Sequence, residues 1–237
     1  MINIAEKTLA TIVRTNHNSV PILEKNHLDF CCKGKRTLSE ACIEKGLNIE
    51  MIIKELKDVN DAANQIHDES DDISAAKLIT HILIKHHFYI KQTMPSILGH
   101  LEKVSSKHGS HYPYMNEVLN KFNTINEDMT NHMYKEEMIL FPRIKEVEND
   151  FLKNNKPVFS DSYINGPIKT MEMEHDDAGE LLNDIRNLTS DYVAPIGACT
   201  TFRVVLDELK YFEEDLHKHV HLENNILFPL AQKMTLN

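Results

Sequence analysis

Two segments of the sequence repeat one pattern of histidine, glutamate and apolar residues. HMYKEEMILFP begins at His132 and HVHLENNILFP begins at His219, and six of the eleven positions are identical. Helical residues four apart lie on the same face, so His132 would stand beside Glu136 and His219 beside Glu223. Imidazoles and carboxylates placed together can ligate a metal ion or move a proton. The repeat therefore predicts a duplicated site for metal or proton chemistry.

One more histidine precedes each copy of the repeat by nearly the same distance. His87 lies 45 residues before His132, and His175 lies 44 residues before His219. Apolar residues at helical spacing mark the same faces as inward, so we expect four histidines and two glutamates to converge on one core. The residues expected on these inward faces are Leu83, Ile84, Ile90 and Met94; Ile125, Met129 and Ile139; Ile168, Met171, Ala178 and Leu182; and Phe212, Leu216 and Ile226.

Metal ions would explain how a core tolerates these polar groups. A buried, unpaired carboxylate is energetically costly, and two cations would compensate for two of them. Four imidazoles and two carboxylates without thiolates suit iron or manganese better than Cu(I) or structural zinc. If both glutamates bridge, each metal has room for a bridging oxygen and a small ligand. The alternatives are a buried His–Glu hydrogen-bond network and, for one ligand, His86 in place of His87.

Other candidate functional residues lie near these positions or near the N-terminus. Glu174 precedes His175, and Asp128 lies on the predicted His132 face, so either could hold or carry protons; plain solvated acids are the alternative. Cys31 and Cys32 are adjacent and cannot easily form a relaxed disulfide with each other, which favours a thiol pair in a turn.

The elements that would position the site are long helices. Four periodic segments, at about 73–107, 113–149, 163–190 and 195–233, predict an all-α protein with an up-and-down four-helix bundle. Residues 1–57 contain shorter helical patterns and breaks, which predicts a small helical N-terminal domain with a Cys-Cys turn. The polar, acidic segment 58–72 is expected to be a linker, and 73–237 the bundle domain.

Composition excludes several classes of partner. The 237 residues include 26 Lys and Arg against 36 Asp and Glu, and the net charge of −10 would repel nucleic acid. No stretch reaches the roughly 18 apolar residues of a membrane span, and the N-terminus lacks the apolar segment of a signal peptide. Four cysteines in a chain of this length form a poor disulfide framework. We expect a cytoplasmic protein without a nucleic-acid or membrane partner.

These motifs together resemble the Repair of Iron Centres family, cytoplasmic bacterial di-iron proteins with a hemerythrin-like bundle and a small N-terminal domain. The resemblance is carried by DFCCKGKRTLSEAC, MEMEHDDAGELL, ACTTF and the two repeated segments, with Lys33 replacing the first glycine of the family's Cys-Cys-Gly-Gly turn. It implies two iron ions with a bridging oxygen species, and a homodimer. The iron ligands that it implies are His87, His132, Glu136, His175, His219 and Glu223.

The resemblance also implies a function. Family membership predicts a stress-response protein that repairs iron-sulfur proteins damaged by nitrosative or oxidative stress, by donating iron from the di-iron centre. Two other functions stay open: an enzyme that reduces nitric oxide to nitrous oxide at the two irons, and a protein that binds or senses nitric oxide or O2.

Overall fold

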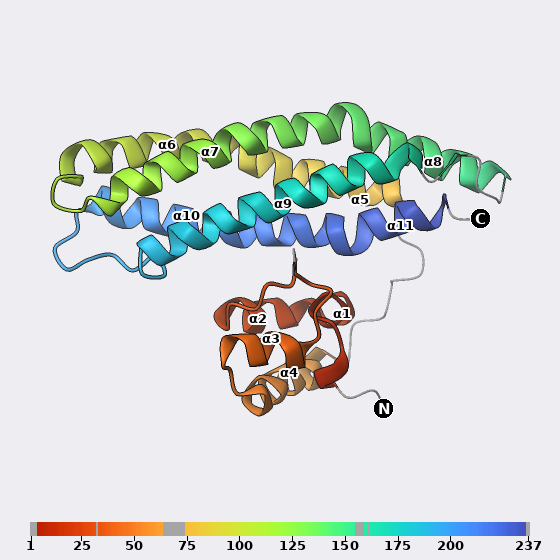
Figure 1. Ribbon diagram of the computed structural model, residues 1–237, viewed down its shortest axis with the longest axis horizontal. Helices are drawn as coiled ribbons and strands as arrows, with labels where there is room; N and C mark the ends of the chain where they lie inside the picture. Colours follow the sequence, from red (N-terminus) through yellow and green to blue (C-terminus); the bar gives the residue numbers. More distant parts are fainter. Residues whose placement is uncertain (1–3, 32, 64–73, 155–158, 161, 236–237) are drawn as a thin grey trace.

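The computed structural model of the chain describes residues 4–31, 33–63, 74–154, 159–160 and 162–235. Regular secondary structure within these ranges is helical, apart from one isolated antiparallel bridge between Thr8 and Thr37. The prediction of an all-α fold is therefore confirmed. Figure 1 shows a long bundle of helices with a smaller group of helices beside it.

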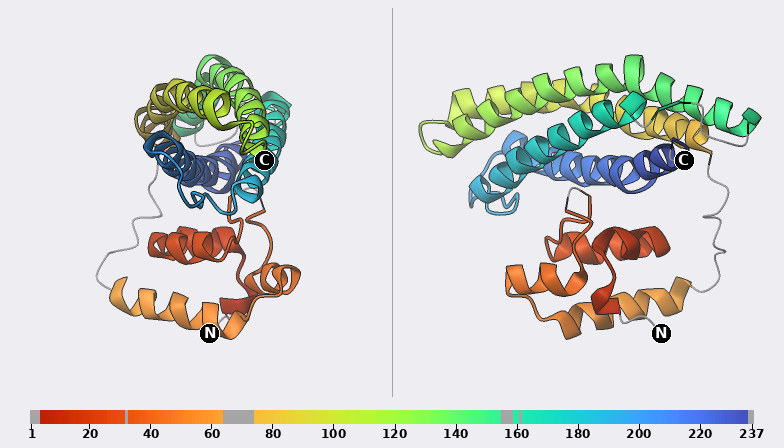
Figure 2. Two further views of the ribbon diagram at one scale, coloured as in Figure 1. Left: turned by 90° about the vertical axis from the view of Figure 1, so that its left-hand side faces the viewer. Right: turned by 45° about the vertical axis from the view of Figure 1, so that its right-hand side comes forward.

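Four antiparallel rods of helix form the bundle. The first rod contains α5 (Ala75–Ile82) and α6 (Phe88–His108), the second α7 (Tyr114–Lys135) and α8 (Phe141–Asn154), the third α9 (Ser162–Leu188), and the fourth α10 (Thr200–Leu222) and α11 (Phe228–Lys233). Viewed end-on, the rods surround a common axis (Figure 2, left). The predicted up-and-down four-helix bundle is confirmed. None of the described helices has the length and apolar character needed to cross a membrane.

A π-helical turn interrupts three of the four rods. These turns are η3 (Leu83–His87), η4 (Glu136–Leu140) and η5 (Glu223–Leu227). A π turn closes i→i+5 hydrogen bonds and accommodates one more residue than an α turn, so side chains in it leave the α-helical phase. Ile84 and Ile139 are accordingly 62% and 42% exposed, and the prediction that they face the core is wrong. Ile226, in the third turn, is only half-buried.

The apolar core of the bundle consists of two clusters with a polar layer between them. One cluster includes Phe122 and Phe212, whose rings pack edge to face with centroids 5.3 Å apart. The other cluster includes Phe228. On each rod the predicted site residues fall between members of the two clusters, as His175 does between Met171 and Ala178. The fold thus holds the candidate site well inside the bundle.

The N-terminal residues fold into a small helical domain around buried leucines. Thr37 and Glu40 form a capping box at the start of one helix, which ends at Gly46 with a positive φ of 64°. The last helix continues through Ala63, so the first six residues of the predicted linker are helical. The rest of that linker lies outside the described residues. The elements are η1 (Ile4–Glu6), α1 (Leu9–Thr15), η2 (His17–Ser19), α2 (Val20–Lys25), α3 (Leu38–Lys45) and α4 (Ile49–Ala63).

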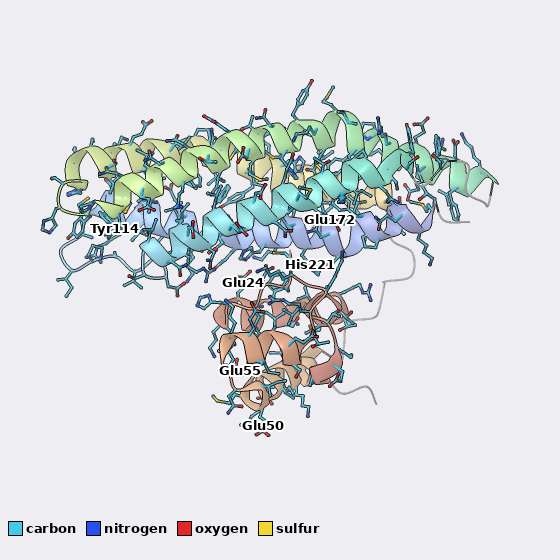
Figure 3. The ribbon with its side chains drawn as sticks, viewed as in Figure 1. Glu24, Glu50, Glu55, Tyr114, Glu172 and His221 are labelled. Carbon is cyan, nitrogen blue, oxygen red and sulfur yellow. The ribbon has the colours of Figure 1, made fainter. Side chains whose placement is uncertain are left out.

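The small domain contacts the bundle through the segment that follows α2. Asn225 Nδ2, in η5, donates to the carbonyl oxygens of Phe30 and Cys31, each at 3.2 Å. The buried Phe30 ring packs edge-on against His221, with centroids 5.6 Å apart. Figure 3 shows Glu24 of the small domain and His221 of the bundle where the two units face each other. The small domain therefore rests on the helix that carries Glu223.

Candidate metal centre

The four histidines and two glutamates singled out by the repeat converge at the centre of the bundle. Each of the six side chains belongs to a residue that is at most 1% exposed. Their ligand atoms form two groups, within each of which every atom lies no more than 4.8 Å from the others. Both glutamates belong to both groups. The first group is His87, Glu136, His219 and Glu223, and the second is His132, Glu136, His175 and Glu223.

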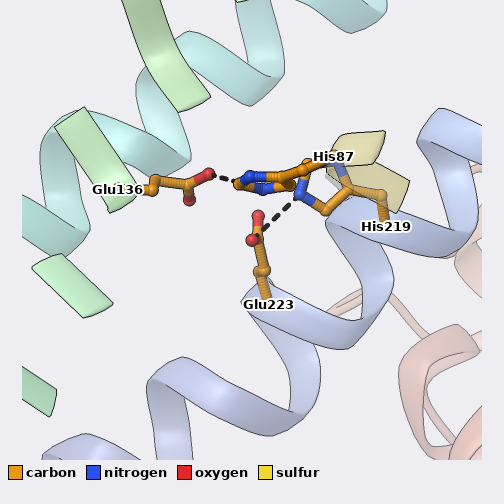
Figure 4. Close-up of side chains that lie close together, drawn as sticks. All are labelled: His87, Glu136, His219 and Glu223. Atoms are coloured by element: carbon orange, nitrogen blue, oxygen red, sulfur yellow. Dashed lines mark hydrogen bonds and ion pairs between the residues drawn. The ribbon is translucent and has the colours of Figure 1, made fainter. Parts of the chain in front are cut away.

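Glu136 lies between two histidines that come from different rods. Its Oε2 atom is 3.3 Å from Nε2 of His87 and 3.3 Å from Nε2 of His132. His87 ends η3 and Glu136 begins η4, so two π turns meet at this contact. Figure 4 shows the Glu136 carboxylate pointing at the His87 ring.

Glu223 repeats this arrangement in the other half of the bundle. Its Oε2 atom is 3.2 Å from Nε2 of His175, and its Oε1 atom is 2.9 Å from Nε2 of His219. All four imidazoles thus present Nε2 to the same small space. The site has the approximate two-fold symmetry that the sequence repeat predicts.

Three of the histidines are fixed from outside by a second hydrogen bond. Nδ1 of His87 is 2.7 Å from Glu137 Oε1, and Nδ1 of His132 is 2.9 Å from Glu174 Oε2. Each carboxylate accepts a hydrogen bond from the Nδ1–H group. In the neutral imidazole the lone pair then lies on the inward Nε2. The neutral histidine tautomer with a free Nε2 is the form that binds a metal.

The same holds for His175, whose Nδ1 lies 2.9 Å from Oδ1 of Asn224. Nε2 of His175 is also only 3.0 Å from Nε2 of His132. Without metal, a proton on one of these two nitrogens makes the contact a hydrogen bond; with both rings protonated on Nδ1 alone, a cation held by the two Nε2 lone pairs would take the place of that proton. The geometry of the two imidazoles therefore fits a metal ion.

The carboxylate of Glu136 gives an independent sign that a cation belongs in the site. Both of its oxygens are buried, and apart from the two 3.3 Å imidazole contacts of Oε2 neither has a hydrogen-bond partner among the described residues. A buried polar group without a partner costs about 1–3 kcal/mol, and more when it is charged. Nitrogen and carboxylate-oxygen donors without thiolates form the donor set that suits iron.

Electrostatics in the protein without metal show how strongly these groups attract positive charge. Burial lowers the pKa of His132, but the Glu136 and Glu174 carboxylates outweigh it and raise that pKa to about 10. The hydrogen bond from His132, supported by Lys135, lowers the pKa of Glu174 to about 2. Burial raises the pKa of Glu223, yet His219 and His175 hold it well below its ordinary value. The site is built to hold cationic charge.

Neighbouring histidines lie outside the group of six. His86 is buried, but its Nδ1 atom faces Asp215, 3.1 Å from each carboxylate oxygen. The structure therefore brings His87, and not His86, to the centre. His217 faces the small domain, where its Nδ1 lies 2.9 Å from Oε1 of Glu24.

The remaining candidate residues differ in whether they contact a histidine of the site. Glu174 contacts His132, as described above. Asp128 is exposed and its side chain makes no hydrogen bond or ion pair within the ranges that the structure describes, so the structure does not bring it to the six side chains. The buried stripe of α7 passes through Ile125 and Met129, and Asp128 lies on its flank. Cys31 is buried and its thiol donates to Asp29 at 3.2 Å, while Cys32 lies outside the described residues.

Sequence reasoning missed Glu137 and Asn224. Each directly follows a glutamate of the repeat, and each accepts from the first histidine of its own half, His87 or His175. Their position in the repeat, directly after each glutamate, could have identified them. The direction of their side chains could not have been predicted, because it depends on the π turns.

Comparison with known proteins places the bundle in a class. Residues 78–231 match the family model of the Hemerythrin HHE cation binding domain. Residues 5–60 match a second model, described as Domain of Unknown function (DUF542). The chain is therefore a hemerythrin-like, cation-binding protein with an additional N-terminal domain.

Relatives over nearly the whole length narrow this class to one family. The iron-sulfur cluster repair protein YtfE of Dickeya chrysanthemi (strain Ech1591) is 34% identical over 228 residues, which cover 95% of this chain and 96% of the relative. The protein of the same name from Escherichia coli O8 (strain IAI1) is 36% identical over 211 residues, 89% of each chain. The chain belongs to the Repair of Iron Centres family.

Proposed function

We propose that this protein repairs iron-sulfur clusters damaged by nitrosative or oxidative stress, and that it does so by donating iron. The observation that carries the proposal is the pair of buried donor groups that share Glu136 and Glu223. Two groups with two shared carboxylates suit a dinuclear centre better than a single ion. Relatives that are similar over most of the chain are named for cluster repair.

The six side chains have separate tasks in this proposal. The four imidazoles would offer Nε2 lone pairs to iron, and the two glutamates, which belong to both groups, would offset its charge and serve both positions. Iron bound there would be the cargo that restores an incomplete cluster. A nitrogen and oxygen donor set binds iron without the thiolates that hold it in a cluster, so transfer to cluster cysteines is chemically reasonable.

Finer points extend the proposal. We propose two iron ions per chain with a bridging oxygen species, and damaged iron-sulfur proteins as the partners. A cytoplasmic location, a homodimer, and nitric oxide or O2 as small ligands of the centre stay predictions from the resemblance. Light scattering on the eluting protein would test the homodimer directly.

A repair assay tests the proposed function. Iron-loaded protein is mixed anaerobically with an enzyme whose iron-sulfur cluster has been nitrosylated, and enzyme activity is followed. We expect recovery well above that given by the same amount of free ferrous iron. The matched control is the Glu136→Leu/Glu223→Leu variant, which should give no more recovery than free iron. Equal recovery from wild-type protein and free iron would contradict donation.

A further inference from the structure

The two halves of the centre are symmetric in their ligands but not in the side chains that support the ligands. The repeat makes position 87 equivalent to 175, and 132 equivalent to 219. The supporting positions are equivalent in the same way, 137 to 224 and 86 to 174. At 137 and 224 both halves have an acceptor, because Glu137 and Asn224 take the Nδ1 protons of His87 and His175.

The symmetry fails at positions 86 and 174. Glu174 accepts from Nδ1 of His132 at 2.9 Å. The equivalent residue, His86, instead stacks on His219, with ring centroids 5.7 Å apart and an interplanar angle of 5°. The Nδ1 atom of His86 is turned away towards Asp215, 3.1 Å distant.

His219 is left without the support that the other three ligands have. Its Nδ1 atom is buried and has no hydrogen-bond partner among the residues that the structure describes. Asp215, which engages His86, occupies the position equivalent to Asp128, an exposed side chain in the other half. His219 thus packs against the stacked ring of His86, whereas the equivalent ligand, His132, contacts the carboxylate of Glu174.

This difference falls unequally on the two metal positions. The position between His132 and His175 has both histidines hydrogen-bonded from outside, by Glu174 and Asn224. The position between His87 and His219 has only the first of its histidines so held. Outer hydrogen bonds orient a histidine and raise its basicity, and their loss typically weakens metal affinity about 10- to 100-fold.

We propose that the two metal positions differ in retention, and that iron between His87 and His219 leaves first. Where the protein donates iron, which rests on the function proposed above, this would be the iron transferred. Glu174 and Asn224 are then positioning residues that retain the second iron. His86 is the residue that makes the first position weaker.

Chelation kinetics test the proposal. Anaerobic diferrous protein is mixed with excess ferrozine, and the coloured complex is followed with time. We expect two phases of equal amplitude, one iron each. Glu174→Ala should speed the slow phase about 10- to 100-fold. Glu174→Gln keeps an acceptor oxygen, so its slow phase should stay close to the wild-type rate. Asp128→Asn is the matched control, because it changes an exposed acid on α7, and it should change neither phase.

A complementary variant tests the weaker position. His86→Glu combined with Asp215→Asn places a carboxylate where Glu174 stands in the other half, without a second acid beside it. The fast phase should become slower, towards the rate of the slow phase. Thermal denaturation of the loaded variant checks that it is folded. If it is not folded, the Glu174→Ala measurement alone decides.

Anomalous diffraction assigns the phases to positions. Crystals of iron-loaded protein soaked briefly in chelator should keep their iron peak between His132 and His175 and lose the one beside His219. A peak kept beside His219, or release of both irons in one phase, would overturn the inference. Unequal release without cluster repair would overturn the proposed function alone. Repair with equal release rates would overturn this inference alone.

Discussion

At the scale of single residues, the centre depends on two buried glutamates that each lie between two histidines. The repeat made these six residues predictable, because helical positions four apart lie on one face of the helix. The hydrogen bonds to Glu137 and Asn224 were not predictable, since adjacent residues in a regular α-helix do not both face one neighbouring rod. Glu136 and Glu137 both contact His87 at the place where a π turn begins.

Replacing a bridging glutamate should remove metal without unfolding the chain. Glu136→Leu or Glu223→Leu takes one carboxylate from both donor groups, so we expect bound iron well below two per chain by anaerobic metal analysis. The helical circular dichroism should persist because leucine is a good helix former and the apolar clusters on either side of the site are unchanged. Asp128→Asn, on the exposed side of α7, should keep two irons. Unchanged iron in the Leu variants would mean that the glutamates do not bridge.

The same substitutions should also act on the metal-free protein. Without metal, Glu136 and Glu223 lie within 3.3 Å of buried imidazole nitrogens. Removing one partner of a buried ion pair costs about 3–5 kcal/mol, whereas replacing both partners by apolar groups is often neutral or stabilising. We therefore expect the metal-free Glu136→Leu/Glu223→Leu variant to melt below metal-free wild type, and iron to raise the melting temperature of wild type alone. A variant that melts at or above the temperature of metal-free wild type would contradict this.

At the scale of elements, the π turns set the register of the bundle around the site. The four helical segments could be predicted from the 3.6-residue period, and their observed ends lie within five residues of the predicted ones. The outward orientation of Ile84 and Ile139 could not be predicted, because the 3.6-residue period assumes an unbroken α-helix. The errors of side-chain orientation therefore cluster at functional turns.

Removing one residue from a π turn should separate folding from metal binding. Met138 is 60% exposed and lies within η4, so its deletion can close the turn to an α-helix while Phe141 and Ile144 keep their core positions. Glu136 and Glu137 would then no longer both reach His87. We expect native-like helicity and less than two irons per chain, and two irons in the Met138→Ala control. Full iron content in the deletion variant would show that the π turn is dispensable.

At the scale of the whole molecule, the small domain is attached to the turn that carries a ligand. Asn225 lies two residues after Glu223 and donates to two carbonyl groups of the small domain. Sequence periodicity could define both units but not this attachment, because it involves backbone acceptors in an irregular segment. The contact links the N-terminal domain to η5 without entering the group of six side chains.

Loosening this attachment should leave the metal centre intact. Asn225→Ala removes two hydrogen bonds, each contributing about 1 kcal/mol. We expect faster amide hydrogen exchange in the segment around Phe30 and Cys31, with two irons per chain retained. Lys35→Ala is a control, because its 3.5 Å contact with Glu172 is exposed and contributes little. Loss of iron in Asn225→Ala would mean that the small domain helps to hold the centre.

The most direct measurement is anomalous diffraction at the iron absorption edge, from crystals of anaerobically iron-loaded protein. Two iron peaks are expected within the bundle, one among His87, His219 and both glutamates, and one among His132, His175 and the same glutamates. A single peak, no peak, or iron bound away from these six side chains would contradict a di-iron centre in this protein.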